Sequence, residues 1–305
     1  MENKLLLIIN PNSGDGEGRN WMFDMVSAFS ERYKYVTTYL SKSRGDIIET
    51  LNECAKEYDA IVCCGGDGTL HEVLNGLVST GTDIPIGYIP TGTLNDFAMS
   101  HNIPFNAVQN IEDIKNGKPV RYDYGVMNGK AFTYVTAFGS FVDVCYKTSQ
   151  EAKAMFGVVA YATEALKKLP NLKGYKVRVT TDTETIEENI VCGVVSNSKS
   201  VAGCRIFKTF PQDNLTDGLL DITLIKYTKN IAEFGEESTA LLLSSESPLI
   251  IRTNSKHVTF SFEGEYPEWT TDGEYGGEGQ NIEIHVVPKG MQIIENNPDQ
   301  EEIHD

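Results

Sequence analysis

Residues 4–123 alternate short apolar runs with amphipathic stretches, and this alternation constrains the fold of the chain more than any other feature of its sequence. The apolar runs that we expect to form strands cover residues 4–9, 35–40, 60–64 and 84–89. Apolar residues recur at helical spacing between them, over residues 17–33, 43–58 and 70–78. Strands that alternate with helices build a parallel sheet, so this half is predicted to be a doubly wound α/β domain.

The pattern changes after Asp123, where β-rich runs replace the helical stretches. These runs cover residues 130–138, 175–181, 185–195, 219–225, 257–262 and 282–287. Gly, Asn and Asp turn signals separate several of them, which favours an antiparallel second domain over residues 124–287. Two helices are expected within that domain, over residues 150–169 and 230–244. Residues 288–305 are the candidate segment for completing the first domain, residues 1–123.

The composition narrows the classes of partner and compartment. Asp and Glu total 43 against 26 Lys and Arg, which gives a formal net charge of −17. Because binding to nucleic acid depends on a basic surface, we expect no nucleic-acid partner. The N-terminus has too short an apolar run for a signal peptide, and no window approaches ~18 apolar residues, so a cytoplasmic protein is predicted. The six cysteines show no CxxC spacing and are expected to be reduced and mostly buried.

The sharpest motif is Gly65-Gly66-Asp67-Gly68-Thr69, which follows one predicted strand and precedes a predicted helix. Glycines at such a junction let backbone amides approach a ligand, and the helix N-terminus adds a positive dipole end, so the motif suits phosphate. It is not a Walker A loop, because the chain has no GK[ST] sequence. The alternative is a tight turn with no ligand.

Two further turns follow predicted strands in the same half. One is Asn10-Pro11-Asn12-Ser13-Gly14, and the other covers residues 90–97. Each turn alone is weak evidence, since either could be an ordinary connection. All three turns lie at the carboxyl ends of predicted parallel strands, where open α/β sheets bind their ligands, so together they predict one site.

The second half holds two acidic turns. Carboxylates in Thr270-Thr271-Asp272-Gly273-Glu274 could hold Mg²⁺ through water or accept a proton, although such turns are more often solvated faces. The segment 214–219 could wrap a hard cation, and an Asp-Gly turn between strands explains it equally well.

A basic segment stands out from the acidic background. Its cations are Lys167, Lys168, Lys173, Lys176 and Arg178. With the apolar residues between them, they could lie on an anionic bilayer. Lysines that close a helix also complement its dipole, so this alternative stays open.

The motifs together resemble those of the soluble bacterial diacylglycerol kinases and the sphingosine kinase-like lipid kinases. The residues that carry the resemblance are GGDGT, a GT-x-NDFA segment made of Gly92, Thr93, Asn95, Asp96, Phe97 and Ala98, and the late Asp-Gly-Glu. It extends from Lys4 to Val287. GGDGT alone is shared with NAD kinases and phosphofructokinases, whereas the combination is much more specific.

The resemblance implies an N-terminal α/β nucleotide-binding domain and a C-terminal β-sandwich. The nucleotide contacts that it implies are Asn10, Pro11, Asn12, Ser13, Gly14, Ser41, Gly65, Gly66, Asp67, Gly68, Thr69, Leu70, His71, Glu72, Thr93 and Asn95. It also implies Glu274 as the general base, with Asp272 beside it, and Asp67 as a catalytic residue that organises metal and water.

The resemblance further implies two roles for Mg²⁺. Asp67, Asp96 and Asp123 would join a water-bridged Mg²⁺ network that reaches Glu274. A separate structural Mg²⁺ would be held by Asn214, Asp217 and Leu219, through two backbone carbonyls and one carboxylate.

Two positions depart from the pattern of the family. Met99 follows the NDFA segment where members often carry Arg, and Asp15 stands in the first glycine-rich loop where a basic residue is usual. Arg19 and the basic segment would compensate for the lost positive charge.

The expected function is transfer of the γ-phosphate of ATP to a lipid alcohol, with diacylglycerol as the leading acceptor and phosphatidic acid and ADP as products. Peripheral membrane contact and a homodimer are expected. The alternatives are an NAD kinase and a non-catalytic nucleotide- or lipid-binding homologue.

Overall fold

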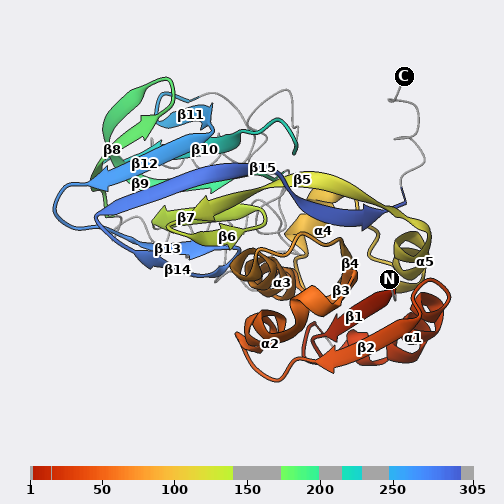
Figure 1. Ribbon diagram of the computed structural model, residues 1–305. Coiled ribbons are helices and arrows are strands. Elements are labelled where there is room, and N and C mark those ends of the chain that lie inside the picture. The colour runs from red at the N-terminus through yellow and green to blue at the C-terminus, as the bar shows by residue number, and fades with distance from the viewer. Residues whose placement is uncertain (1–2, 15, 140–172, 199–214, 229–246, 297–305) are drawn as a thin grey trace, which may run out of the picture. The chain divides into compact units, whose positions relative to one another are not determined.

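The computed structural model describes residues 3–14, 16–139, 173–198, 215–228 and 247–296 (Figure 1). The predicted helices over 150–169 and 230–244 lie outside these residues, as do Asp15, Lys167, Lys168 and Asn214. The chain divides into two compact units. Unit 1 comprises residues 1–123 and 289–305, and unit 2 comprises residues 124–288. Each unit is described by itself.

Unit 1 is built on a parallel sheet. Its strand order is β2 (Tyr35–Leu40), β1 (Lys4–Ile9), β3 (Ala60–Gly65), β4 (Ile86–Pro90) and the last part of β15 (Asn281–Glu295). All the neighbouring pairs in this order are parallel. β3 is buried at every position, which explains its continuous apolar sequence. The predicted strands match closely, except that β4 begins two residues later than expected.

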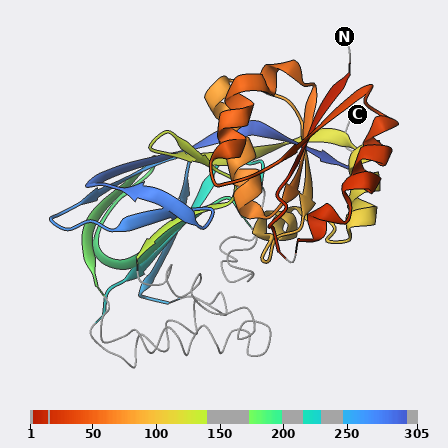
Figure 2. The same cartoon turned by 90° about the horizontal axis from the view of Figure 1, so that it is seen from below.

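Helices cover both faces of this sheet (Figure 2). They are α1 (Met22–Ser30), α2 (Asp46–Cys54), α3 (Asp67–Thr80), α4 (Asp96–His101) and α5 (Ala107–Asn116), with short 3₁₀ turns at Glu17–Arg19 and Ala55–Glu57. α1 and α5 pack on one face around Phe29 and Ile114. Gly76 lets α3 approach α2, because a Cβ there would lie 2.7 Å from Leu51 Cδ1. The doubly wound α/β prediction is confirmed, although α4 and α5 were not expected from periodicity.

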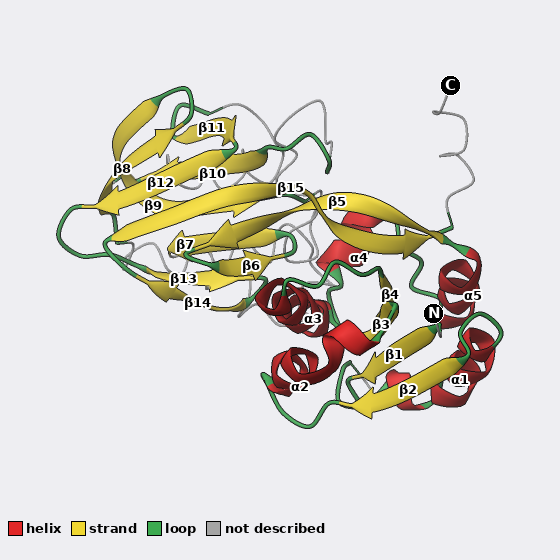
Figure 3. Ribbon diagram, viewed as in Figure 1, coloured by secondary structure: helices red, strands yellow, loops and turns green. Residues whose placement is uncertain are grey.

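Unit 2 consists of antiparallel strands (Figure 3). The order is β14 (Glu274–Glu278), β13 (Glu268–Thr271), β7 (Val135–Gly139), β9 (Thr185–Ser196), β8 (Tyr175–Thr181), β12 (His257–Phe262) and β15. β9 also pairs with β10 (Leu220–Lys226), which pairs with β11 (Ile250–Ser255), and β5 (Lys118–Met127) pairs with β6 (Lys130–Phe132). The expected antiparallel arrangement is confirmed.

One aromatic cluster fills the core of unit 2. Phe138, Phe260 and Trp269 come from β7, β12 and β13, with ring centroids 4.7 to 5.8 Å apart. Apolar residues from β8, β9, β10 and β15 join the same core, so the sheet wraps around a shared interior in the manner of a sandwich. The single strand predicted over 130–138 is wrong, because the chain breaks between β6 and β7 at residues 133–134.

Three of the four cysteines that the structure describes are buried. Cys54, Cys63, Cys64 and Cys192 are free thiols, as expected. Burial raises the pKa of the Cys64 thiol to about 11, so it stays protonated and unreactive. No helix among the residues that the structure describes is long and apolar enough to cross a membrane.

Candidate functional site

The loops that leave the carboxyl end of the unit 1 sheet are tied together by backbone hydrogen bonds. The amide of Asn10, after β1, donates to the carbonyl of Cys64 at 2.9 Å. The amide of Thr91, after β4, donates to the carbonyl of Gly65 at 2.9 Å, and the amide of Ser41, after β2, donates to the end of β1 at 2.9 Å. The turns singled out in the sequence therefore lie at one edge, and Ser41 lies with them.

These turns cross one another at glycines. Gly14 has a φ of 55°, and a Cβ there would collide with the carbonyl oxygen of Thr91. Gly66 and Gly92 touch backbone to backbone, because a Cβ on Gly66 would lie 3.1 Å from the Cα of Gly92 and one on Gly92 would collide with the Cα of Gly66. With side chains excluded, main-chain groups of three turns lie close together. This arrangement suits a phosphate group.

The N-terminus of α3 belongs to the same edge. Gly66 is its N-cap and makes no side-chain capping hydrogen bond. The amides of Thr69 and Leu70 both return to the Gly66 carbonyl, at 2.9 and 3.2 Å. The positive end of the dipole of a 14-residue helix therefore stands beside the glycine crossings without a side-chain cap, which favours an anion there.

Two asparagine side chains hold the turns in position through hydrogen bonds. Asn95 is buried with a φ of 51°, and its Oδ1 accepts from the amide of Gly92 at 3.0 Å and from the hydroxyl of Tyr88 at 3.3 Å. The Nδ2 of Asn10 donates to Thr69 Oγ1 at 3.2 Å. Both asparagines therefore hold loop conformation, and in this geometry Asn95 acts as a positioning residue.

Asp67, the first residue of α3, holds the start of α4. Its Oδ2 accepts from the amide of Asp96 at 3.0 Å, and its Oδ1 accepts from the amide of Phe97 at 3.2 Å. A carboxylate at a helix N-terminus is stabilised by the helix dipole. The acidic residue of the GGDGT motif thus connects the turn after β3 with the turn after β4.

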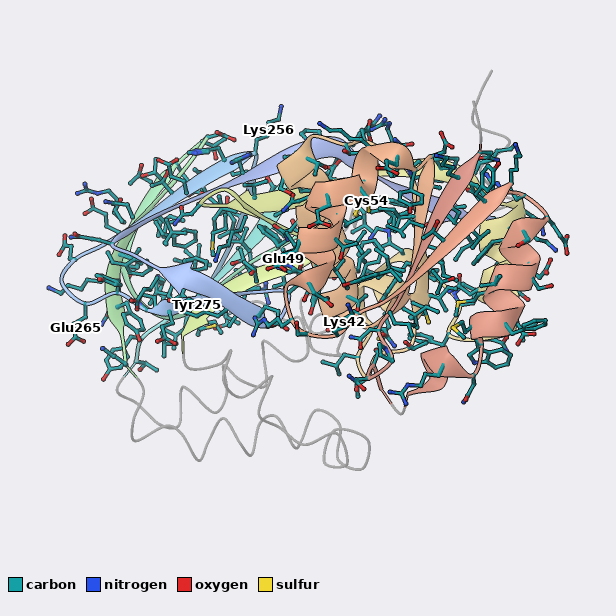
Figure 4. All side chains as sticks on the ribbon, turned by 60° about the horizontal axis from the view of Figure 1, so that its bottom comes forward. Lys42, Glu49, Cys54, Lys256, Glu265 and Tyr275 are labelled. Atoms are coloured by element: carbon teal, nitrogen blue, oxygen red, sulfur yellow. The ribbon has the colours of Figure 1, made fainter. Side chains whose placement is uncertain are left out.

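The loop after β2 is joined to α3 through Glu72. The Oε1 of Glu72 accepts from the amide of Gly45 at 3.0 Å, while its Oε2 is buried and accepts no hydrogen bond from the described part of the chain. Lys42 and Arg44 in this loop are exposed, and Lys42 is labelled in Figure 4. Arg19 is exposed in the turn that precedes α1. This edge therefore carries cations on a strongly acidic chain.

The other predicted nucleotide residues lie in the same loops or in the first turns of α3. Those that are at least partly exposed are Pro11, Asn12, Gly68, His71 and Thr93. Ser13, Gly65 and Thr69 are buried. The Leu70 side chain has no exposed surface, so it packs in the core and could contact a ligand only through its backbone.

Two members of the predicted acidic network of unit 1 are buried, and the third, Asp67, is partly exposed. Asp96 and Asp123 are 0% and 1% exposed, and Asp123 Oδ1 accepts from the amide of Lys289 at 2.6 Å. Within the described ranges, no group of three or more His, Cys, Asp or Glu side chains lies close enough to hold a metal ion. Any Mg²⁺ at this edge would thus depend on water and on ligand oxygens.

Asp272 in unit 2 is a structural anchor. It is 4% exposed with a φ of 49°, and its carboxylate accepts from the amides of Thr133 at 2.7 Å, Tyr134 at 3.0 Å and Val135 at 3.2 Å. These bonds break the strand predicted over 130–138 into β6 and β7. The interpretation of this turn as a solvated face is wrong for Asp272.

Glu274 begins β14, directly after the tight turn at Asp272 and Gly273. It pairs with Thr271 across the β13–β14 hairpin and is half-buried. Asp272 and Glu274 therefore differ in environment. The carboxylate of Asp272 accepts three backbone amides, whereas Glu274 is half-buried at the start of β14.

The two other sequence candidates in unit 2 are only partly described. Asp217 is exposed, its Oδ1 accepts from the amide of Leu219 at 2.9 Å, and Gly218 has a φ of 74°, which is an Asp-Gly turn before β10. Asn214, the third predicted metal ligand, lies outside the described residues. In the basic segment, Lys173 pairs with Glu265 and Arg178 pairs with Glu187 at 2.7 Å.

Comparison with known proteins gives two matching family models. The diacylglycerol kinase catalytic domain matches residues 4–127, and the YegS C-terminal NAD kinase beta sandwich-like domain matches residues 142–295, half of the chain. A diacylglycerol kinase of Bacillus subtilis is 30% identical over 293 residues, covering 92% of this chain and 95% of the relative.

The chain belongs to the diacylglycerol kinase family.

Further members agree with this assignment. A diacylglycerol kinase of Staphylococcus carnosus is 28% identical and covers 97% of this chain and 98% of its own. A crystal structure assigned to a diacylglycerol kinase of Bacillus anthracis matches with a TM-score of 0.80 and 26% identity, covering 97% of this chain and 98% of that one. The expectation of an ATP-dependent lipid kinase is thereby confirmed at the level of the family, and so is its two-part fold.

Sequence reasoning missed one residue that shapes the site of this diacylglycerol kinase family member. Gly92 was noted only as part of a motif, yet its lack of a side chain permits the contact with Gly66. Its place in a turn after a predicted strand was the available signal. The contact itself joins residues 26 positions apart and is invisible to local patterns.

Proposed function

We propose that this chain transfers the γ-phosphate of ATP to the hydroxyl of diacylglycerol and releases phosphatidic acid and ADP. The observation that carries the proposal is the crossing of Gly14, Gly66 and Gly92 beside the N-terminus of α3. Family membership supplies the reaction class, and the names of the relatives supply the acceptor.

The proposed nucleotide contacts follow from the loop edge of unit 1. The loop from Asn10 to Gly14 and residues 66–69 would contact the phosphates, with the backbone amides of Gly14, Gly66 and Gly68 as donors and Lys42 and Arg44 adding positive charge. The buried Glu72 Oε2, which accepts no hydrogen bond within the described residues, is suited to a donor such as a ribose hydroxyl. Ser41, in the same loop, would provide a further polar contact.

Mg²⁺ would enter with the phosphates of ATP. Its chemistry is to neutralise the charge that builds on the transferring group. Each carboxylate oxygen of Asp67 already accepts one backbone amide, so Asp67 would reach the ion through water on its remaining lone pairs. We propose that Asp96 and Asp123 also act on the ion through bridging water.

Glu274 is the proposed general base, which would accept the proton of the lipid hydroxyl. Asp272 is disfavoured, because its carboxylate accepts three backbone amides and is almost fully buried. We assign Asp272 the role of fixing the turn that presents Glu274. The acceptor resides in membranes, so a cytoplasmic enzyme with peripheral membrane contact is also proposed, and the homodimer stays a prediction.

The first experiment measures transfer of labelled γ-phosphate from ATP to diacylglycerol in mixed micelles with Mg²⁺. The expected product is labelled phosphatidic acid, with no labelling when NAD replaces the lipid. Labelling of NAD instead would overturn the proposal in favour of an NAD kinase. ATP binding without acceptor-dependent consumption would leave a nucleotide-binding homologue.

A second experiment tests the nucleotide site by itself. Gly92→Ala would force a methyl group against Gly66, so we expect ATP affinity in equilibrium titrations to fall by about tenfold, since a displaced turn loses roughly one charge-assisted hydrogen bond. Gly279→Ala is the matched control, because a Cβ there has only ordinary contacts at 3.5 Å. Equal affinity in both variants would place the phosphates elsewhere.

A further inference from the structure

α1 and α5 form a parallel pair on one face of the unit 1 sheet (Figures 1 and 2). Their carboxyl ends are joined by Arg32, whose Nη1 donates to the carbonyls of Ile114 and Lys115 at 2.9 Å and of Gly117 at 3.0 Å. Lys115 also pairs with Glu31 at 3.4 Å. Because the carboxyl ends meet and the helices have 9 and 10 residues, their N-terminal ends also lie at the same level.

The N-terminal ends of this pair carry exposed apolar side chains. Phe23 and Met22 on α1 are 80% and 40% exposed, and Phe105 and Val108 at the start of α5 are 56% and 54% exposed. Phe23 is the most exposed of the large apolar side chains in the described residues. We name these four residues the α1–α5 apolar surface.

The surroundings of the α1–α5 apolar surface are close to neutral. Residues 97–111 contain no Asp, Glu, Lys or Arg, in a chain in which these make up 23% of all residues. On the α1 side, residues 16–30 carry Glu17, Asp24 and Arg19, which leaves one net negative charge. An anionic or cationic partner would find little complementary charge here, whereas an apolar one would.

The α1–α5 apolar surface lies at the functional edge of unit 1. α1 follows the loop after β1, and Nδ2 of Asn110 in α5 donates to the carbonyl of Tyr88 near the end of β4 at 3.0 Å. Both N-terminal ends are therefore on the same side of the sheet as the glycine crossings.

We propose that the α1–α5 apolar surface inserts into the interface of a lipid bilayer and docks unit 1 there. This proposal rests on the proposed function, in which the acceptor is a membrane lipid. Aromatic side chains on helix ends favour the interfacial zone of a bilayer, and a surround with few charges keeps the desolvation cost of insertion small. The surface supplements the basic segment, in which Lys173 and Arg178 are already paired with carboxylates.

A second copy of the chain fits this surface less well. The four side chains expose roughly 400 Å² of apolar area, if fully exposed aromatic side chains are taken at about 200 Å² each. A stable dimer needs about 800 Å² on each partner, so the surface is too small alone. Insertion into a bilayer needs no such minimum.

The test measures sedimentation of the full chain with phosphatidylcholine vesicles, in the absence of ATP. We expect the partition coefficient to fall about tenfold for Phe23→Ser, about tenfold for Phe105→Ser, and further for both together, as expected for removal of buried aromatic area. The binding should change little between low and high salt and without anionic lipid, because it is apolar. Thermal unfolding of each variant confirms that the fold is intact.

Tyr266→Ser is the matched control, since Tyr266 is 44% exposed in unit 2, outside the α1–α5 apolar surface. Loss of binding in this variant and not in Phe23→Ser would overturn the proposal. So would strongly salt-dependent binding, or a change of oligomeric state in Phe23→Ser with vesicle binding unchanged.

Failure of the proposed function is separable from failure of docking. Phosphorylation of a dispersed short-chain diacylglycerol tests the reaction without a bilayer, and Phe23→Ser should keep parental turnover in that assay. A parent chain that binds vesicles through Phe23 but phosphorylates no diacylglycerol would reject the acceptor and leave the docking surface standing.

Discussion

The turn at Asp67 in unit 1 and the turn at Asp272 in unit 2 each use an aspartate carboxylate to accept backbone amides. Asp67 accepts two backbone amides at the start of α4, and Asp272 accepts three between β6 and β7. The groups beside the two aspartates differ. In unit 1 it is the uncapped N-terminus of α3 and glycine backbone, and in unit 2 it is the half-buried carboxylate of Glu274.

The difference teaches that a conspicuous acidic residue in a motif need not perform the chemistry. At the carboxyl edge of a parallel sheet, backbone amides can bind an anion, and Asp67 holds the neighbouring loops in position. An antiparallel hairpin presents no such set of amides, so we propose that unit 2 contributes through the side chain of Glu274, which follows the turn anchored by Asp272.

The largest expected effect is on kcat, and it tests whether Glu274 and not Asp272 is the general base. Glu274→Gln should lower kcat for lipid phosphorylation by about 10²- to 10⁴-fold while ATP affinity and thermal stability stay at parental values, because only the proton acceptor is lost. Glu278→Gln, on the exposed end of the same hairpin, is the control and should keep full turnover. Parental kcat in Glu274→Gln would remove it from the mechanism.

The next effect is on stability. Asp272→Ala should lower the free energy of unfolding by about 3 kcal/mol in urea titrations, because it leaves three buried amides without their acceptor. Glu278→Ala removes an exposed carboxylate nearby and should change stability little. If Asp272→Ala unfolds like the parent but has lost turnover, the roles of the two carboxylates are reversed.

A third prediction concerns pH and the carboxyl end of β15 in unit 1. Burial raises the pKa of Glu295 from 4.5 to about 7, and Tyr122 donates to its Oε2 at 2.9 Å. Between these pH values the folded chain retains a proton that the unfolded chain has released, so stability falls as pH rises through this window.

Glu295→Gln removes this ionisation and should stabilise the chain by on the order of 2 kcal/mol at pH 8, with little change near pH 4. Urea unfolding at the two pH values measures it. Glu283→Gln, exposed on the unit 2 part of the same strand, is the control. If the unfolding free energy of Glu295→Gln depends on pH as that of the parent does, another group titrates in this pH range.

The smallest effect tests the unit 1 anchor. Asp67→Asn keeps an acceptor for one of the two α4 amides, places an NH₂ donor opposite the other and removes the charge that complements the helix N-terminus, so we expect a loss of about 1.5 kcal/mol in unfolding free energy. Chemical denaturation at low and high salt measures it, with the difference shrinking at high salt. A loss as large as that expected for Asp272→Ala would mean that Asp67 and Asp272 contribute equally to stability.

Much of the fold could be predicted from local sequence. Local sequence patterns placed β1, β2, β8 and β12 at their observed bounds. β1 is a buried apolar run and β8 and β12 alternate between buried and more exposed residues, whereas β2 has no buried position and is predicted by its β-branched and aromatic residues. α4 escaped notice because it has six residues, too few to establish a period, and begins after Asn95 in a left-handed conformation.

The sequence by itself determined the two-part architecture and the three turns at one sheet edge, since each depends on short-range periodicity or on glycine placement. Only the tertiary structure decided that Asp272 is buried and accepts three backbone amides, whereas Glu274 lies half-buried at the start of β14. It also decided that Phe23 and Phe105 are exposed at the N-terminal ends of two neighbouring helices, α1 and α5. The partners of Asp272 lie 137 to 139 positions away, and a hydrogen bond over that separation depends on the strand topology.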